Sequence, residues 1–152
     1  MVKIVLYSED YANQLEMLLE KFSKEVFGKE SCDLELFVNN HWAIYLAIKG
    51  NVVVGFSSFN IQDYYGFTDS VVGNDYIYIS KEYRTSKAMF LFSIQAGKVS
   101  KELNMPLEHY YSSNMSRLAS KRLKGILVYE TYQYSVEEVA RVTEQLKRRI
   151  GR

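Results

Sequence analysis

Three side chains able to bind phosphate stand together at a turn between an apolar segment and a segment with helical periodicity. Thr85 and Ser86 close the polar stretch 81–86, which follows the apolar run 76–79, and Lys87 comes next in the helix-like residues 86–103. A strand that enters a helix through such a turn directs the unpaired amide groups of the first helical turn at whatever lies beyond the strand. Hydroxyl and ammonium groups add charge-assisted hydrogen bonds worth about 1.5–3 kcal/mol each. The stretch 74–103 therefore predicts an anion-binding site.

The elements that position this turn alternate between β-rich and helical patterns. A two-residue turn, Gly50-Asn51, joins two apolar, β-branched runs and predicts a tight hairpin that needs positive φ. Ser8 or Asp10 is placed to cap the first helix. Strands are predicted at 2–7, 42–49, 52–61, 76–79, 107–111 and 126–134, and helices at 11–26, 33–38, 86–103, 115–124 and from 135 to the end.

This order predicts an α/β chain, with a mixed α+β sheet that carries helices on its faces. A single domain of residues 1–152 is expected, with a core at 1–134 and an added C-terminal helix at 135–152. Val71 and Val72 either open a strand or extend the preceding loop, and Gly73 is expected to interrupt the pattern. The three aromatic residues of the loop 63–69 either pack over the edge of the sheet or form a substrate platform.

Composition excludes several classes of protein. The 19 basic and 18 acidic residues leave a formal charge of +1, which gives no global attraction to nucleic acid or to an anionic membrane. No apolar run is long enough for a signal peptide or a membrane span, so a cytoplasmic location is expected. One cysteine, Cys32, and two histidines, His41 and His109, exclude an internal disulfide and a zinc site built on cysteine.

The stretch from Tyr76 to Arg84, with the segment 114–125, resembles the GCN5-related N-acetyltransferase superfamily, in particular its small phage members. Residues 76–84 look like the fourth strand of that family and the start of its cofactor loop, and residues 114–125 look like the helix before its last strands. The likeness runs from position 2 to about position 134. It implies an acyl-CoA N-acyltransferase fold and acetyl-CoA as co-substrate.

In that family the cofactor loop begins with arginine or glutamine and has small residues at two later positions, where it wraps the pyrophosphate. Arg84 matches the first position, but Lys87 and Met89 occupy the two small ones. The backbone of the fourth strand is expected to bind the pantetheine arm as an added strand does. The resemblance implies that the cofactor-binding residues are Ile77, Tyr78, Ile79, Arg84, Thr85, Ser86, Lys87, Ala88, Met89 and Asn114.

The resemblance also implies where the catalytic groups lie. Asp75 stands where many members carry an acidic general base, although an ordinary aspartate at a strand end is an equal reading. Asn74 or Tyr76 is placed to help position a water, and the tyrosine that often serves as general acid is replaced by Lys121. Tyr111 is one of several tyrosines able to take that role. The two histidines can also titrate near neutrality.

The expected function is therefore transfer of an acetyl group from acetyl-CoA to an amine of an unidentified small-molecule or protein acceptor. One alternative is a binding protein that keeps the fold with a degenerate cofactor loop. A second is contact with nucleic acid through basic residues near positions 117–124 and 147–152, which are also typical of solvated helix faces. The apolar stripe of the last helix must pack on its own sheet or on a second copy, which makes a homodimer a further prediction.

Overall fold

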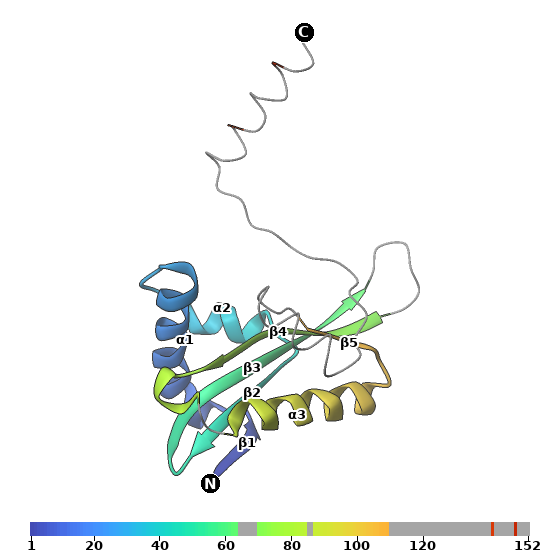
Figure 1. Ribbon diagram of the computed structural model, residues 1–152, viewed down its shortest axis with the longest axis horizontal. Coiled ribbons are helices and arrows are strands. Elements are labelled where there is room, and N and C mark those ends of the chain that lie inside the picture. The colour runs from blue at the N-terminus through green and yellow to red at the C-terminus, as the bar shows by residue number, and fades with distance from the viewer. Residues whose placement is uncertain (64–69, 85–86, 110–140, 142–147, 149–152) are drawn as a thin grey trace. The chain divides into compact units, whose positions relative to one another are not determined.

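The computed structural model describes residues 1–63, 70–84, 87–109, 141 and 148 (Figure 1). The chain divides into two compact units, Met1–Tyr110 and Tyr111–Arg152. The fold described below is that of the first unit. The prediction that one domain spans the whole chain stays a prediction, and so do the elements expected beyond residue 110.

A five-stranded mixed sheet forms the centre of this unit. Its strands stand in chain order, and β1 to β4 are antiparallel, whereas β4 and β5 are parallel. The strands are β1 (Val2–Leu6), β2 (Ala43–Lys49), β3 (Val52–Asp63), β4 (Ser70–Ile79) and β5 (Leu107–His109). The predicted mixed sheet is confirmed.

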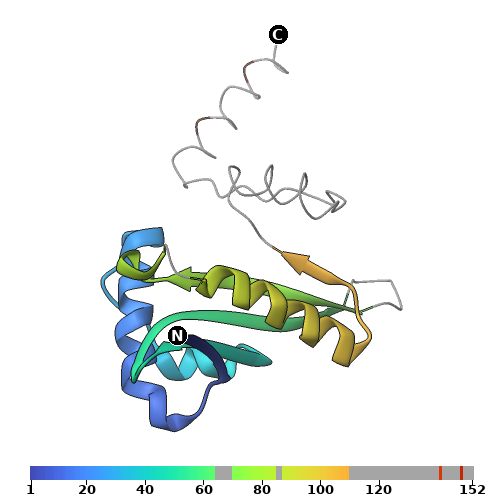
Figure 2. The same ribbon diagram turned by 60° about the horizontal axis from the view of Figure 1, so that its bottom comes forward.

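Helices cover both faces of the sheet (Figure 2). The helices α1 (Ala12–Phe27) and α2 (Leu34–Asn39) lie on one face, and α3 (Ala88–Leu103) lies on the other. Single 3-10 turns, Glu9–Tyr11 and Lys81–Tyr83, lead into α1 and towards α3. The apolar side of each long helix is buried, and its members are Leu15, Leu18, Leu19 and Phe22 on α1 and Ala88, Phe92, Ala96 and Val99 on α3.

Local sequence signals explain most of the element ends. Gly50 has a φ of 63° in the hairpin between β2 and β3, as predicted from the Gly-Asn turn. Asp33 caps α2, because its carboxylate accepts a hydrogen bond from the Leu36 amide at 2.9 Å. The predicted cap of α1 is wrong: Ser8 makes no side-chain cap bond, and α1 follows the 3-10 turn directly.

Strand β4 is longer than the sequence predicts. Gly73 does not interrupt it, because the strand runs without a break from Ser70 to Ile79. The irregularity lies two residues later: Ser58 and Phe59 of β3 stand opposite Tyr76 and Asn74, so Asp75 is an extra residue without a partner in the ladder. This is a β-bulge, which re-aims the side chain it carries.

Among the described helices none is long and apolar enough to cross a membrane. Several predicted site and loop positions fall outside the described residues, namely the aromatic loop at 64–69, Thr85, Ser86, Tyr111, Asn114 and Lys121.

Candidate active site

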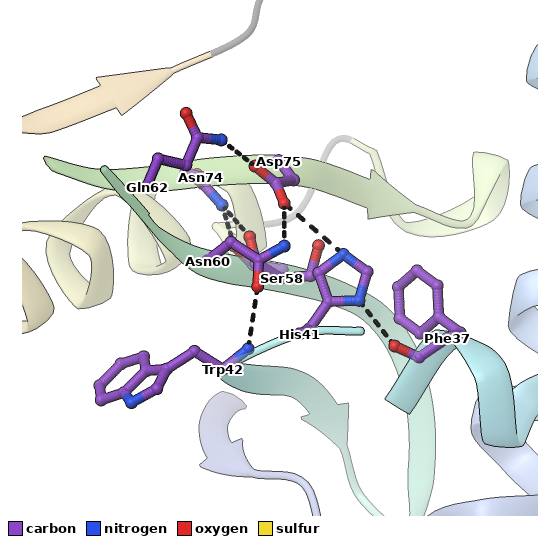
Figure 3. Close-up of polar contacts among 9 residues, drawn as sticks. Phe37, His41, Trp42, Ser58, Asn60, Gln62, Asn74 and Asp75 are labelled. Carbon is purple, nitrogen blue, oxygen red and sulfur yellow. Dashed lines mark hydrogen bonds and ion pairs between the residues drawn. The ribbon is translucent and has the colours of Figure 1, made fainter. Parts of the chain in front are cut away.

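The bulge on β4 presents the carboxylate of Asp75 to two amide side chains of β3 (Figure 3). Asn60 Nδ2 donates a hydrogen bond to Asp75 Oδ2 at 2.7 Å, and Gln62 Nε2 donates to Oδ1 at 3.4 Å. Asn60 and Gln62 are two positions apart on one strand, so they point to the same face of the sheet. Each carboxylate oxygen of Asp75 therefore has an amide donor.

The backbone of Trp42 sets the orientation of the Asn60 amide. The Trp42 N–H donates to Asn60 Oδ1 at 3.1 Å, while the indole ring points away from Asp75 (Figure 3). A carboxamide has one accepting and one donating end. With its oxygen held by the Trp42 amide, Asn60 can present only its NH₂ group to Asp75.

Gly73 makes room for this arrangement. A Cβ atom at Gly73 would lie 2.8 Å from Gln62 Nε2 and 3.1 Å from Asp75 Oδ1. Contacts this short require at least the Gln62 amide to move. The glycine that was expected to interrupt the strand instead leaves space beside the Asp75 carboxylate.

His41 approaches Asp75 from the segment between α2 and β2 (Figure 3). Its Nδ1 is 2.7 Å from the Phe37 carbonyl oxygen, and its Nε2 is 3.7 Å from Asp75 Oδ2. The ring is packed between aromatic neighbours, with centroid distances of 4.4 Å to Phe37 and 6.0 Å to Tyr76. The His41 side chain is 7% exposed and that of Asp75 is 17% exposed. The imidazole of His41 is therefore more deeply buried than the carboxylate of Asp75.

Burial raises the pKa of Asp75 above its ordinary value. The Asn60 hydrogen bond and the charge of His41 act in the opposite direction, and burial prevails. A carboxyl group whose pKa is raised towards neutrality is a better proton acceptor in its ionised form than an ordinary aspartate. Asp75 is thus suited to accept a proton from a bound molecule.

Asn74, the predicted partner of Asp75, points to the opposite face of β4. Its Nδ2 donates to Ser57 Oγ and to the Ser58 carbonyl oxygen, both at 2.9 Å, and the residue is 2% exposed. Among the described residues, Asn74 Oδ1 and Ser58 Oγ have no hydrogen-bond partner. The structure does not bring Asn74 and Asp75 together on one face, and a role for Asn74 in placing a water stays a prediction.

In the described part of the chain, no strand pairs with β4 beyond Asn74 on the side of β5. Among the described residues, β5 pairs with β4 only at Val72, Gly73 and Asn74. The side chains of Ile77 and Ile79 pack in the cluster under α3, whereas Tyr78 packs against α1. Their side chains are therefore used by the core, and backbone groups are what this part of β4 can offer to a ligand.

Arg84 is held by the protein itself. Its Nε donates to the Ile79 carbonyl oxygen at 3.0 Å, and its guanidinium lies 2.5 Å from Glu25 Oε1 at the end of α1. The Tyr78 hydroxyl donates to the second oxygen of Glu25 at 3.0 Å. The Arg84 hydrogen bond holds the pKa of Glu25 below its ordinary value. A phosphate that binds Arg84 must compete with Glu25, although 45% of the arginine side chain is exposed.

The remaining described positions of the predicted cofactor loop surround the start of α3. Lys87 is the residue before the helix and is exposed, Ala88 is fully buried against the sheet, and Met89 is 37% exposed. The two larger residues at the expected small positions therefore both reach solvent. Thr85 and Ser86 lie outside the described residues.

A second polar region, at Cys32, lacks the chemistry of a nucleophile or a metal site. A hollow of about 510 Å³ is lined there by Ser31, Cys32 and several acidic residues. Burial raises the pKa of the Cys32 thiol, so it is protonated at neutral pH. Within the described part of the chain, no three His, Cys, Asp or Glu residues gather as metal ligands do.

No protein-family model and no curated protein matches the sequence, but solved structures match the fold. One is AAC(6')-Iy in complex with the bisubstrate analogue CoA-S-monomethyl-acetylneamine: TM-score 0.68, 15% identity, covering 89% of this chain and 97% of the other. Another is the ribosomal-protein-alanine N-acetyltransferase from Brucella melitensis: TM-score 0.65, 18% identity, covering 88% and 98%. A third is a transcriptional regulator from Bacillus halodurans: TM-score 0.70, 13% identity, covering 89% and 99%.

The chain has the fold of the GCN5-related N-acetyltransferases. The fold expected from residues 76–84 is confirmed. The site around Asp75 also contains residues that the sequence did not single out, namely Asn60 and Gln62, and it gives His41 a neighbour that could not be foreseen. The i, i+2 spacing of the two amides on a predicted strand was the one available signal, since it places both on one face.

Proposed function

We propose that this protein transfers an acetyl group from acetyl-CoA to an amine of an acceptor molecule. The observation that carries the proposal is the carboxylate of Asp75, held by two amide donors on a β-bulge beside the strand edge of an acetyltransferase fold. A neighbour with this fold is described with an analogue that joins CoA to an amine-derived acceptor. That neighbour supports the substrate class without identifying the acceptor.

Asp75 would act as the general base. An amine is protonated at neutral pH and has no lone pair until the proton leaves, so the carboxylate must accept it. The amine nitrogen then attacks the thioester carbonyl carbon and a C–N bond forms. The C–S bond breaks, the nitrogen loses its second proton, and the leaving thiolate takes that proton to become the CoA thiol. Backbone N–H groups along the edge of β4 are suited to stabilise the oxyanion that develops on the carbonyl oxygen.

The residues around the β4 edge fit acetyl-CoA in two respects. The backbone of Ile77 and the amide N–H of Ile79 can pair with the amides of the pantetheine arm as a neighbouring strand does, while the Ile79 carbonyl oxygen already accepts the hydrogen bond of Arg84 Nε. The exposed guanidinium of Arg84 and the ammonium of Lys87 lie on either side of the turn before α3, where a pyrophosphate needs positive charge.

One observation favours a second candidate, a binding protein with this fold and no catalysis. Arg84 already has a carboxylate partner in Glu25, so its charge is compensated within the protein. An enzyme should bind acetyl-CoA and transfer its acetyl group, whereas a binding protein should show no transfer; the fold is the same in both cases.

Calorimetric titration with acetyl-CoA and with CoA tests the cofactor, and release of CoA thiol in the presence of amines tests transfer. Ligand at about 100 times its dissociation constant should stabilise the fold by roughly 2.7 kcal/mol. The first acceptors to try are an aminoglycoside and a peptide with an N-terminal alanine, because the structural neighbours are named for such substrates. Absence of heat and of thermal stabilisation at millimolar ligand contradicts both the cofactor and the enzyme; binding without transfer favours the second candidate.

A matched pair of variants tests the phosphate contact. Replacing Arg84 by alanine should weaken CoA binding, and Glu25→Gln should strengthen it, because the glutamine leaves the guanidinium without a competing carboxylate. The ion pair is partly exposed, so its loss should cost the fold no more than about 1 kcal/mol. Equal affinity in wild type and both variants would show that the pyrophosphate is bound elsewhere.

A further inference from the structure

The tautomer of His41 is fixed by its contact with α2. The Phe37 carbonyl oxygen, 2.7 Å from Nδ1, can only accept a hydrogen bond, so Nδ1 carries a hydrogen. In a neutral imidazole the other nitrogen then holds the lone pair. The basic atom of His41 is therefore Nε2, and it faces Asp75 Oδ2 at 3.7 Å.

Two proton acceptors thus face each other without a proton between them when Asp75 is ionised and His41 is neutral. The distance of 3.7 Å between Nε2 and Oδ2 is longer than a hydrogen bond. Small rotations of the two side chains would bring these atoms within hydrogen-bonding distance. One added proton turns the contact into a charge-assisted Nε2–H···Oδ2 bond. The geometry favours uptake of a single proton by the two residues together.

The depths of the two side chains give the order in which a proton reaches them. Asp75 is 17% exposed, whereas His41 is 7% exposed and covered by the rings of Phe37 and Tyr76. The carboxylate is the more exposed of the two side chains, so it is the one that we expect a bound acceptor to contact. A proton that reaches Nε2 from the acceptor therefore passes through Asp75.

We propose that His41 and Asp75 form one proton-accepting pair, in which Asp75 removes the proton from the acceptor ammonium and His41 Nε2 holds it during acetyl transfer. The N–H bond of the ammonium breaks, a new N–H bond forms at Nε2, and the charge of the pair rises from −1 to 0. After attack the nitrogen loses a second proton, which the leaving thiolate takes to form the CoA thiol, and the proton held by the pair is released to solvent. The inference rests on the proposed function, and it makes His41 a positioning residue that acts through Asp75.

Few other ionisable groups surround the pair in the described part of the chain. The residues that contact it are Phe37 of α2, Asn60 and Gln62 of β3 and Tyr76 of β4, and Glu108 of β5 stands opposite Gly73 in the parallel ladder. Of these, Tyr76 and Glu108 carry ionisable side chains. Both are therefore controls for any change assigned to His41, through Tyr76→Phe and Glu108→Gln.

Two substitutions of His41 separate its hydrogen bond from its basicity. In His41→Asn the amide nitrogen replaces Nδ1, so the bond to the Phe37 carbonyl can remain while the basic atom is removed. In His41→Gln an amide can reach Asp75 but cannot accept a proton. If His41 holds the proton, both variants lose kcat by roughly tenfold to a hundredfold with little change in KM, part of the factor of about 10²–10⁴ typical of general acid–base catalysis.

The pH dependence distinguishes this role from a structural one. The pair takes up a proton more readily than Asp75 alone, so removal of His41 should move the acidic limb of the kcat/KM profile to lower pH. A positive charge on His41 lowers the pKa of Asp75, and this effect is lost in the variant. The carboxyl carbon of Asp75, identified by its loss in Asp75→Asn, should titrate at higher pH in His41→Asn than in wild type. An unchanged carboxyl titration, or full activity in His41→Gln, overturns the proposal.

A nitrogen-15 spectrum of the rings decides the tautomer without any activity measurement. The chain has two histidines, so a His109→Gln variant assigns both sets of signals. The proposal expects His41 to carry its hydrogen on Nδ1 when neutral, and a hydrogen on Nε2 contradicts it. If the protein transfers no acetyl group to any amine, the proposed function fails. The nitrogen-15 spectrum of the rings and the titration of the Asp75 carboxyl carbon still support or overturn the proton-sharing pair.

Discussion

Replacing Asp75 by asparagine should separate catalysis from stability. Asparagine has nearly the same shape, so its Oδ1 can still accept the hydrogen bond from Asn60, whose orientation the Trp42 amide fixes. At the second oxygen the new NH₂ group meets the Gln62 amide, which must turn to present its oxygen. The present hydrogen bond of 3.4 Å between Gln62 and Asp75 is lost, which costs about 0.5–1.5 kcal/mol.

Removal of the negative charge of Asp75 should stabilise the folded protein. The pKa of Asp75 is raised, which means that its ionised form is less well stabilised in the folded protein than in water. Each pKa unit of such a shift corresponds to about 1.4 kcal/mol. The two contributions oppose each other at neutral pH. The free energy of unfolding of the variant should therefore lie within about 1 kcal/mol of the wild-type value, and its Tm within about 4 °C.

The sign of the pH dependence follows from the raised pKa. Asp75 contributes stability that is complete below its ordinary pKa of 3.8 and is lost as the pH rises through its raised value in the folded protein. The asparagine of the variant does not titrate, so the stability of the variant relative to wild type should rise with pH across that window. Urea unfolding at a series of pH values measures this difference.

Catalysis should fall far more than stability. Loss of a general base costs about 10²–10⁴ in rate, or roughly 3–5 kcal/mol of transition-state stabilisation. Thiol release on the same protein samples measures it. If the free energy of unfolding of the variant is more than about 2 kcal/mol below that of wild type at neutral pH, the carboxylate is needed to hold β3 to β4. If the rate of the variant is within a factor of about ten of wild type, the general base lies elsewhere.

Three further substitutions test the framework of the site by urea unfolding or hydrogen exchange. Gly55→Ala should destabilise the fold by about 1–3 kcal/mol, because its Cβ would lie 2.6 Å from the Tyr78 carbonyl oxygen, which β3–β4 pairing holds in place; wild-type stability would refute this contact. Phe92→Ala should cost about 3–5 kcal/mol, because the ring is fully buried under the sheet, and a loss below about 2 kcal/mol would contradict that burial. Asp33→Ala should cost about 0.5–2 kcal/mol and speed amide exchange in α2, since it removes the cap on the Leu36 amide; unchanged exchange would show that the cap is dispensable.

The fold of the described unit could be predicted largely from local patterns. Helical spacing of apolar residues gave α1 and α3, and the Gly50 turn gave the hairpin with the correct strands on either side. Each of these signals lies within a few residues of the element it specifies. The course of β4 was predicted less well, because a glycine inside a strand reads as a break unless its neighbours across the sheet are known.

The site could be predicted only in part, because its contacts are non-local. Asp75 was found by resemblance and is the residue on which the polar network centres. Asn60 and His41 lie 15 and 34 positions before it in the chain, and nothing in their own surroundings indicates that they approach a carboxylate. The partner of Arg84 was missed for the same reason, since Glu25 is 59 residues away.

The β-bulge explains why a carboxylate is tolerated at this point of the sheet. Side chains alternate between faces along a regular strand, and Asn74 and Ile77 both point to the α3 face. Two residues, Asp75 and Tyr76, fit between them on the other face only because the strand contains one extra residue. If the strand were regular and Tyr76 kept its present place, position 75 would point to the α3 face. There the buried cluster is apolar, and a buried charge without a partner is costly. The bulge therefore places the acid beside its amide donors and His41, at the point where the described pairing of β4 with β5 ends.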